Sequence, residues 1–141
     1  MKKKKTYSVC VFCGSKSGSL YKYTQIAEKL GIALAQKKFT LVYGGGRLGL
    51  MGTLSRSFFE NNGDLISIVP NHFKNKKNLT KTPGKLIWTN TFAERKAVMI
   101  KLADVFIALP GGYGTLDEII EVISLNKLNE INKKIILVDE N

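Results

Sequence analysis

Three ionisable side chains in the second half of the chain are spaced so that they could act together. Glu118 and Glu121 lie three residues apart in a segment that predicts a helix, so they share one side of it. Arg95 precedes Val98 and Met99 by three and four residues, which places its guanidinium on the helical stripe that should face a sheet. The chemistry suggested is anion binding or ion pairing beside shielded carboxylates.

The shielding follows from the apolar surroundings of these groups. The helix that carries Glu118 and Glu121 is apolar on almost every side, so its carboxylates need partners or their pKa values rise. A buried arginine also needs a partner. We therefore expect Arg95 to meet Glu118, Glu121 or a ligand anion, with a purely structural ion pair as the alternative.

A glycine-rich loop directly precedes these carboxylates. Pro110-Gly111-Gly112-Tyr113-Gly114-Thr115 leads from an apolar strand into the helix. Unpaired backbone N–H groups and the positive end of the helix dipole favour a phosphate at such a place. The alternative is a capping box, in which Glu118 only returns a hydrogen bond to the backbone of Thr115.

A second glycine loop, Gly44-Gly45-Gly46-Arg47-Leu48-Gly49, matches the G-x-G-x-x-G pattern of dinucleotide sites. Such sites also need an acidic residue at the end of the next strand to hold the ribose. That strand ends in Ile68-Val69-Pro70-Asn71, and Asp64 precedes it, which argues against NAD. A backbone that can approach a ligand closely at Gly45 and Gly46 remains, and a tight turn is the alternative.

These segments lie in a regular alternation of strands and helices. Apolar, Val-rich runs predict strands that are buried on both faces, and amphipathic runs predict helices between them. We expect one α/β domain over residues 1–141, a Rossmann-like, doubly wound parallel sheet with helices on both faces. Ligands then bind beyond the carboxyl ends of the strands. The predicted strands are 7–13, 40–43, 65–69, 86–89, 105–109 and 135–138, and the predicted helices are 21–37, 48–61, 92–102 and 115–128.

Composition narrows the classes of partner. The net charge of +11 comes largely from scattered lysines, which indicates a solvated surface and general attraction for anions rather than a specific nucleic-acid site. No apolar run reaches the roughly 20 residues of a membrane span, and no signal peptide is recognised, so we expect a cytoplasmic protein without a membrane partner. Cys10 and Cys13 should point to opposite faces of a strand, as buried thiols rather than a redox pair.

Taken together, several segments resemble the LOG family of cytokinin riboside monophosphate phosphoribohydrolases, whose members were often labelled lysine decarboxylases. The resemblance runs in order from Tyr7 to Val138. It rests on Cys13-Gly14-Ser15, Tyr43-Gly44-Gly45-Gly46, Gly49-Leu50-Met51-Gly52, Glu94-Arg95-Lys96, and Pro110-Gly111-Gly112-Tyr113-Gly114-Thr115 with Glu118.

The resemblance implies a usually dimeric enzyme that releases free base and ribose 5-phosphate from a purine nucleotide, cytokinin riboside 5′-monophosphate or AMP, without metal or cofactor. It implies catalytic roles for Arg95 and Glu118. It places substrate contacts at Lys96, Gly111, Gly112, Tyr113, Gly114, Thr115, Leu116, Asp117 and Ser124. We also expect substrate contacts at Ser15, Gly45, Gly46 and Glu121. By analogy with glycosidases, the Glu118 carboxylate would stabilise positive charge on the ribose and orient or deprotonate water.

The sequence also departs from the family pattern. In the family the loop after the third strand usually carries a glutamate, and Asn78 is the residue closest to that position here. Lys16 occupies a position where the family commonly has a small hydroxyl residue, and Leu125 one where it commonly has a tryptophan. Family members usually continue beyond the last strand with a helix, whereas this sequence ends at Asn141. A nucleotide-binding module without catalysis is the main alternative function. Lysine decarboxylation would need a Schiff-base lysine for pyridoxal phosphate, and none is recognisable.

Overall fold

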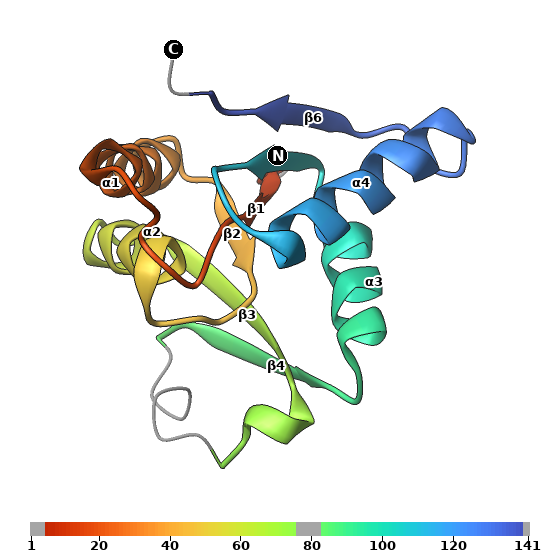
Figure 1. Cartoon of the computed structure of the whole chain (residues 1–141), viewed down its shortest axis with the longest axis horizontal. Helices are drawn as coiled ribbons and strands as arrows, with labels where there is room; N and C mark the ends of the chain where they lie inside the picture. Colours follow the sequence, from red (N-terminus) through yellow and green to blue (C-terminus); the bar gives the residue numbers. More distant parts are fainter. Residues whose placement is uncertain (1–4, 76–82, 140–141) are drawn as a thin grey trace.

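The protein folds as a parallel sheet with helices on both faces (Figure 1). The structure is a computed structural model that describes residues 5–75 and 83–139. The strand order of the six-stranded sheet is β4-β3-β2-β1-β5-β6. The strands are β1 Ser8–Phe12, β2 Thr40–Tyr43, β3 Asp64–Pro70, β4 Lys85–Thr89, β5 Val105–Ala108 and β6 Lys134–Leu137. The helices are α1 Tyr21–Gln36, α2 Gly49–Glu60, α3 Phe92–Leu102 and α4 Tyr113–Lys127, with a 3-10 turn at Asn71–Phe73.

The helices cover the sheet in two pairs, α1 with α2 and α3 with α4, as Figure 1 shows. Ala27 and Leu54 pack with one cluster of buried side chains, and Met99 and Ile119 pack with the other. The predicted doubly wound parallel sheet is therefore confirmed. The central strands β1, β2, β3 and β5 are largely buried, because the crossovers through the four helices cover both faces of the sheet. The connection from β3 to β4 carries the 3-10 turn in place of a helix, and the edge strand β6 is mostly exposed.

The central strand β1 divides its side chains between these two clusters. Cys10 packs on the α3 and α4 side, and Cys13, just beyond the strand, packs on the α1 and α2 side. Both cysteines are free and buried. The interpretation of Cys10 and Cys13 as separate buried thiols is confirmed.

Most boundaries agree with the sequence prediction to within a residue or two. Strand 40–43 and helix 92–102 coincide with β2 and α3. The largest difference is at α4, which begins at Tyr113 rather than Thr115, with Gly112 as its N-cap. The 3-10 turn at Asn71–Phe73 was not predicted, and Lys76 to Asn78 of the following basic stretch lie outside the described residues.

Among residues 5–75 and 83–139, no helix is both long and apolar enough to cross a lipid bilayer.

Candidate functional site

A pocket of about 610 Å³ opens where β1 and β5 end, next to the start of α4. The loop that follows Phe12 forms one wall, the loop that follows Ala108 forms another, and side chains of α2, α3 and α4 complete it. This is the place that the topology predicts, because ligands of open α/β sheets bind beyond the carboxyl ends of the strands. The lining residues are Cys13, Gly14, Ser15, Lys16, Gly18, Ser19, Tyr23, Met51, Arg95, Pro110, Gly111, Gly112, Tyr113, Gly114, Thr115 and Glu118.

Arg95 of α3 and Glu118 of α4 face each other across this pocket. Arg95 Nη2 lies 3.9 Å from Glu118 Oε2, and both side chains are largely shielded from solvent. The Arg95 guanidinium also stacks over the ring of Phe92, 4.8 Å from its centroid. The expected meeting of Arg95 with Glu118 is confirmed, although the pair is too far apart for a strong hydrogen bond.

Burial dominates the electrostatics of this pair. Desolvation raises the pKa of Glu118 to about 7, and the positive charge of Arg95 acts in the opposite direction. Burial also lowers the pKa of Arg95, which the negative charge of Glu118 partly offsets. Glu118 can therefore exchange a proton near neutral pH, as a general acid or base must.

The loop between β5 and α4 presents backbone N–H groups to the pocket. Gly112 is the N-cap of α4 and contributes no side-chain cap. The first-turn N–H groups of Tyr113, Gly114 and Thr115 have no hydrogen-bond partner within the described part of the chain. They can receive an anion at the positive end of the helix dipole. The capping-box alternative is wrong, because Thr115 lies inside α4 instead of preceding it.

The glycine loop after β2 packs against residues that form the walls of this pocket. A Cβ atom on Gly44 would lie 3.1 Å from Arg95 Nη1, so the glycine leaves room for the guanidinium. Two of the first N–H groups of α2 are already used, since Leu50 donates to the Lys16 carbonyl and Met51 to the Gly14 carbonyl. These bonds hold the loop that follows β1 in place and leave α2 with fewer free donors for a phosphate.

A dinucleotide site at that loop is further opposed by Asp64. Asp64 begins β3, and its carboxylate accepts a hydrogen bond of 3.0 Å from Thr40 Oγ1 at the start of β2. Both groups lie at the amino end of the sheet, away from the edge where a ribose would bind. The position of Asp64 before the body of that strand, on which the sequence argument against NAD rests, is confirmed.

On another side of α4 lies a shallow groove built around Lys96. Its ammonium group is 3.0 Å from Asp117 Oδ2 and 2.6 Å from Glu121 Oε2. Hydrogen bonding to Glu121 is the main cause that raises the pKa of Lys96, with Asp117 adding to it. Lys96 is therefore held protonated, which disfavours it as a Schiff-base nucleophile. The groove is lined by Lys96, Tyr113, Leu116, Asp117, Ile120, Glu121 and Ser124.

The residues selected from the sequence thus fall into three groups. Ser15, Arg95, Gly111 to Thr115 and Glu118 line the pocket. Lys96, Leu116, Asp117, Glu121 and Ser124 line the groove, and Tyr113 borders both. Gly45 and Gly46 line neither of these two hollows.

Sequence reasoning did not select several lining residues. Cys13, Tyr23 and Met51 enter the wall from three separate segments. Burial raises the pKa of the Cys13 thiol to about 12, and the negative charge of Glu118 adds to the effect. Two signals could have identified Cys13 as a lining residue, its position at the carboxyl end of a central strand and its place in the segment Cys13-Gly14-Ser15.

Comparison with known sequences gives consistent results. The profile of a family described as possible lysine decarboxylase matches residues 51–141. A cytokinin riboside 5′-monophosphate phosphoribohydrolase of Rhodococcoides fascians is 41% identical over 141 residues, which is 95% of this chain and 68% of that protein. A protein of the same name from Arabidopsis thaliana is 43% identical over 93% of this chain and 58% of its own length. The chain spans little more than half the length of several such plant relatives.

Solved structures share the fold at lower sequence identity. The molybdenum cofactor carrier protein of Chlamydomonas reinhardtii superposes with a TM-score of 0.77 at 20% identity, covering 95% of this chain and 76% of that one. The molybdenum cofactor binding protein of Rippkaea orientalis gives a TM-score of 0.74 at 24% identity, covering 97% of this chain and 80% of that one. At these identities the likeness establishes the fold alone.

Proposed function

This chain belongs to the family of the cytokinin riboside 5′-monophosphate phosphoribohydrolases, and on that basis we propose that it hydrolyses the N-glycosidic bond of a purine riboside 5′-monophosphate. The products are the free base and ribose 5-phosphate. The observation that carries the proposal is the shielded Glu118 carboxylate, with a pKa of about 7, in the same pocket as the N–H groups that begin α4.

In this proposal the loop from Gly111 to Thr115 binds the 5′-phosphate. Its unpaired N–H groups and the dipole of α4 match a phosphate dianion, and Lys16 on the facing wall adds positive charge. Fixing the phosphate there holds the ribose against the carboxylate, so binding energy from a group that does not react positions the bond that breaks.

Glu118 is the residue that we place beside the reacting carbon. Breaking the N-glycosidic bond develops positive charge on the ribose, which a carboxylate stabilises, and the same carboxylate takes a proton from the attacking water. Arg95 keeps its proton under all ordinary conditions, so it binds substrate and favours the ionised form of Glu118 instead of acting as an acid.

The finer features of the proposal concern substrate, assembly and location. We assign cytokinin riboside monophosphate or AMP as the substrate, a homodimer as the assembly and the cytoplasm as the compartment. The dimer is supported by apolar side chains that α4 exposes, among them Leu116 and Ile120. The relatives named cytokinin riboside 5′-monophosphate phosphoribohydrolase support the choice of nucleotide.

The proposal is tested by separating the products of incubation with AMP, isopentenyladenosine 5′-monophosphate and, as a control, adenosine. We expect free base from at least one nucleotide and at least a hundredfold slower release from adenosine, because the nucleoside lacks the phosphate that the loop binds. Equal rates with AMP and adenosine would exclude the phosphate loop. Folded protein that binds nucleotide and releases no base would instead indicate a binding module.

A further inference from the structure

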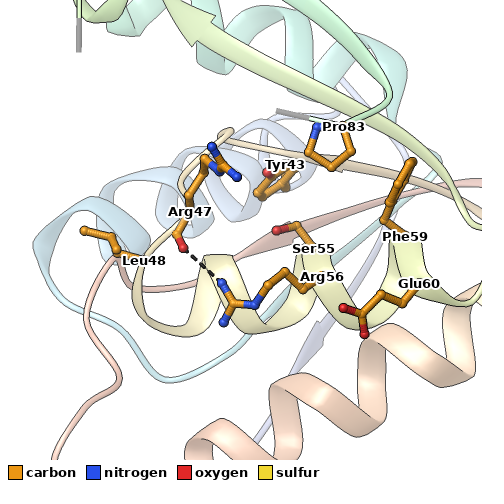
Figure 2. A pocket seen from close by; sticks show the side chains of 8 residues that line it. All are labelled: Tyr43, Arg47, Leu48, Ser55, Arg56, Phe59, Glu60 and Pro83. Atoms are coloured by element: carbon orange, nitrogen blue, oxygen red, sulfur yellow. Dashed lines mark hydrogen bonds between the residues drawn. The ribbon is translucent and has the colours of Figure 1, made fainter. Parts of the chain in front are cut away.

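A second cavity of about 390 Å³ lies between the loop after β2, the outer side of α2 and the start of β4 (Figure 2). None of its lining residues also lines the pocket of Arg95 and Glu118. It is therefore a separate hollow, to which the proposed function assigns no role. Its lining residues are Tyr43, Arg47, Leu48, Ser55, Arg56, Phe59, Glu60 and Pro83.

Two guanidinium groups border this cavity. Arg56 of α2 donates from Nη1 to the Arg47 carbonyl at 3.1 Å, the bond dashed in Figure 2. One of the five N–H donors of Arg56 is thereby used, and the others have no partner within residues 5–75 and 83–139. The Arg47 guanidinium makes no hydrogen bond or ion pair with any residue that the structure describes. The pair of arginines thus retains most of its capacity to bind an anion with two or more oxygens.

One lining residue of the cavity, Tyr43, carries a buried hydroxyl group beside the hydroxyl of Ser67. Tyr43 and Ser67 are completely buried, and neither hydroxyl closes a hydrogen bond within residues 5–75 and 83–139. Ser55 and Ser67 lie close enough to Tyr43 to lower its pKa, which burial as the larger effect raises. The Tyr43 hydroxyl is shielded from solvent, so Tyr43 forms part of the wall and the two arginines supply the free donors of the cavity.

The remaining walls are apolar. Leu48, Phe59 and Pro83 border the same space, and Leu48 and Phe59 are substantially exposed. Among the lining residues that the structure describes, Glu60 is the one carboxylate and Arg47 and Arg56 are the two cations. The lining therefore combines excess positive charge with a flat apolar surface, the usual composition of a site for a small amphipathic anion.

We propose that this second cavity binds a phosphomonoester that carries a small apolar or aromatic group. Arg47 and Arg56 bind the phosphate, because a dianion with three terminal oxygens matches two guanidinium groups better than a single carboxylate does. Leu48, Phe59 and Pro83 contact its apolar part.

The test is a titration of the whole ¹⁵N-labelled chain with phenyl phosphate, followed residue by residue in amide spectra. We expect saturable shifts at Arg47, Leu48, Ser55, Arg56 and Phe59 with one common dissociation constant. Any binding to the loop that begins α4 is read separately, from the amides of residues 111–118. Shifts confined to residues 111–118 would overturn the second site.

Variants identify the groups that bind. Arg47→Gln and Arg56→Gln should each weaken phenyl phosphate binding at the second cavity at least tenfold. Glu60→Gln should strengthen binding, because it removes a negative charge that repels the phosphate. Lys29→Gln, on the exposed side of α1, removes the same charge elsewhere and should change the dissociation constant less than twofold. If Lys29→Gln weakened phenyl phosphate binding as much as the arginine variants do, the loss would come from net charge alone, which would overturn the site.

Binding of benzoate tests whether the cavity prefers a phosphate to a carboxylate on the same aromatic ring. We expect it to bind the second cavity at least fivefold more weakly than phenyl phosphate, and equal affinity would overturn the assignment of a phosphomonoester. None of these measurements depends on turnover. Loss of base release with the shifts at Arg47 retained would contradict the proposed function alone, and release of base without those shifts would contradict the second site alone.

Discussion

Arg95 Nη2 and Glu118 Oε2 stand 3.9 Å apart inside a largely shielded pocket, close enough to influence each other's pKa and too far apart to be fully satisfied by each other. A structural ion pair usually closes to a bidentate hydrogen-bonded contact. Here both groups keep donors and acceptors available to a ligand, and Phe92 supports the guanidinium from its other side. This arrangement favours a binding or catalytic role over a purely structural one.

Glu118→Gln tests the catalytic role directly. We expect nucleotide binding within about threefold of the parent and turnover at least about a hundredfold lower, because the amide cannot take a proton from water or carry negative charge. Calorimetric binding of AMP and chromatography of the released base measure the two quantities. Parent-like turnover would show that Glu118 only helps to pack α4 against Arg95.

The pH dependence of kcat/KM should report the pKa of Glu118. If the ionised form is active, kcat/KM rises about tenfold per pH unit below pH 7 and levels off above it, since burial raises the pKa to about 7. Arg95→Gln removes the charge that lowers this pKa, so the rising limb should move to higher pH. If the rise in kcat/KM lies near pH 4.5, or does not move in Arg95→Gln, the ionisation of Glu118 does not control the rate.

Apolar patterning predicted the elements because the central strands of this sheet are buried on both faces. Val9 and Val11 on one side of β1 and Cys10 and Phe12 on the other are all buried, so the strand is recognisable as a short continuous apolar run. The alternation of strands and helices and the glycine loop before Glu118 then correctly predicted the pocket at the carboxyl ends of the strands. Helix ends were less certain, since α4 begins without any capping side chain that a sequence pattern could reveal.

The division of the site was not predicted, because spacing along a helix does not reveal which neighbour each side faces. Arg95 and Lys96 are adjacent, yet about 100° apart around α3, so one reaches Glu118 and the other reaches Asp117 and Glu121. Glu118 and Glu121 were expected on one side of α4. Their separation into pocket and groove follows from the position of α3, which only the packed structure fixes.

Gly114→Ala tests the phosphate loop without disturbing the fold. A Cβ atom at Gly114 would meet nothing within 4 Å, and alanine favours the helical conformation, so thermal stability should stay equal or rise. If a phosphate lies against this first turn, the added methyl group should nevertheless raise KM for AMP about tenfold or more. Steady-state kinetics beside a melting curve measure both effects.

Gly111→Ala is the matched variant at the other end of the loop. There a Cβ atom would overlap Thr115 Oγ1, so the loop itself has to shift and stability should fall along with activity. An unchanged KM in Gly114→Ala would place the phosphate away from the start of α4.

Glu118→Gln should also stabilise the protein in a pH-dependent way. The pKa of Glu118 is about 7 in the folded chain and 4.5 in the unfolded reference, so between these values the folded chain holds the extra proton. The free energy of unfolding therefore falls as pH rises from 4.5 to 7, and a neutral amide avoids this loss. With about 1.4 kcal/mol per pKa unit, the variant should gain up to about 3 kcal/mol at pH 8, shrinking toward zero near pH 4.5. Urea unfolding of parent and variant at pH 5 and pH 8 measures the difference. A variant less stable than the parent at pH 8 would mean that the charged carboxylate is compensated by its partners, in which case the pocket holds an ordinary ion pair and stores no strain for catalysis.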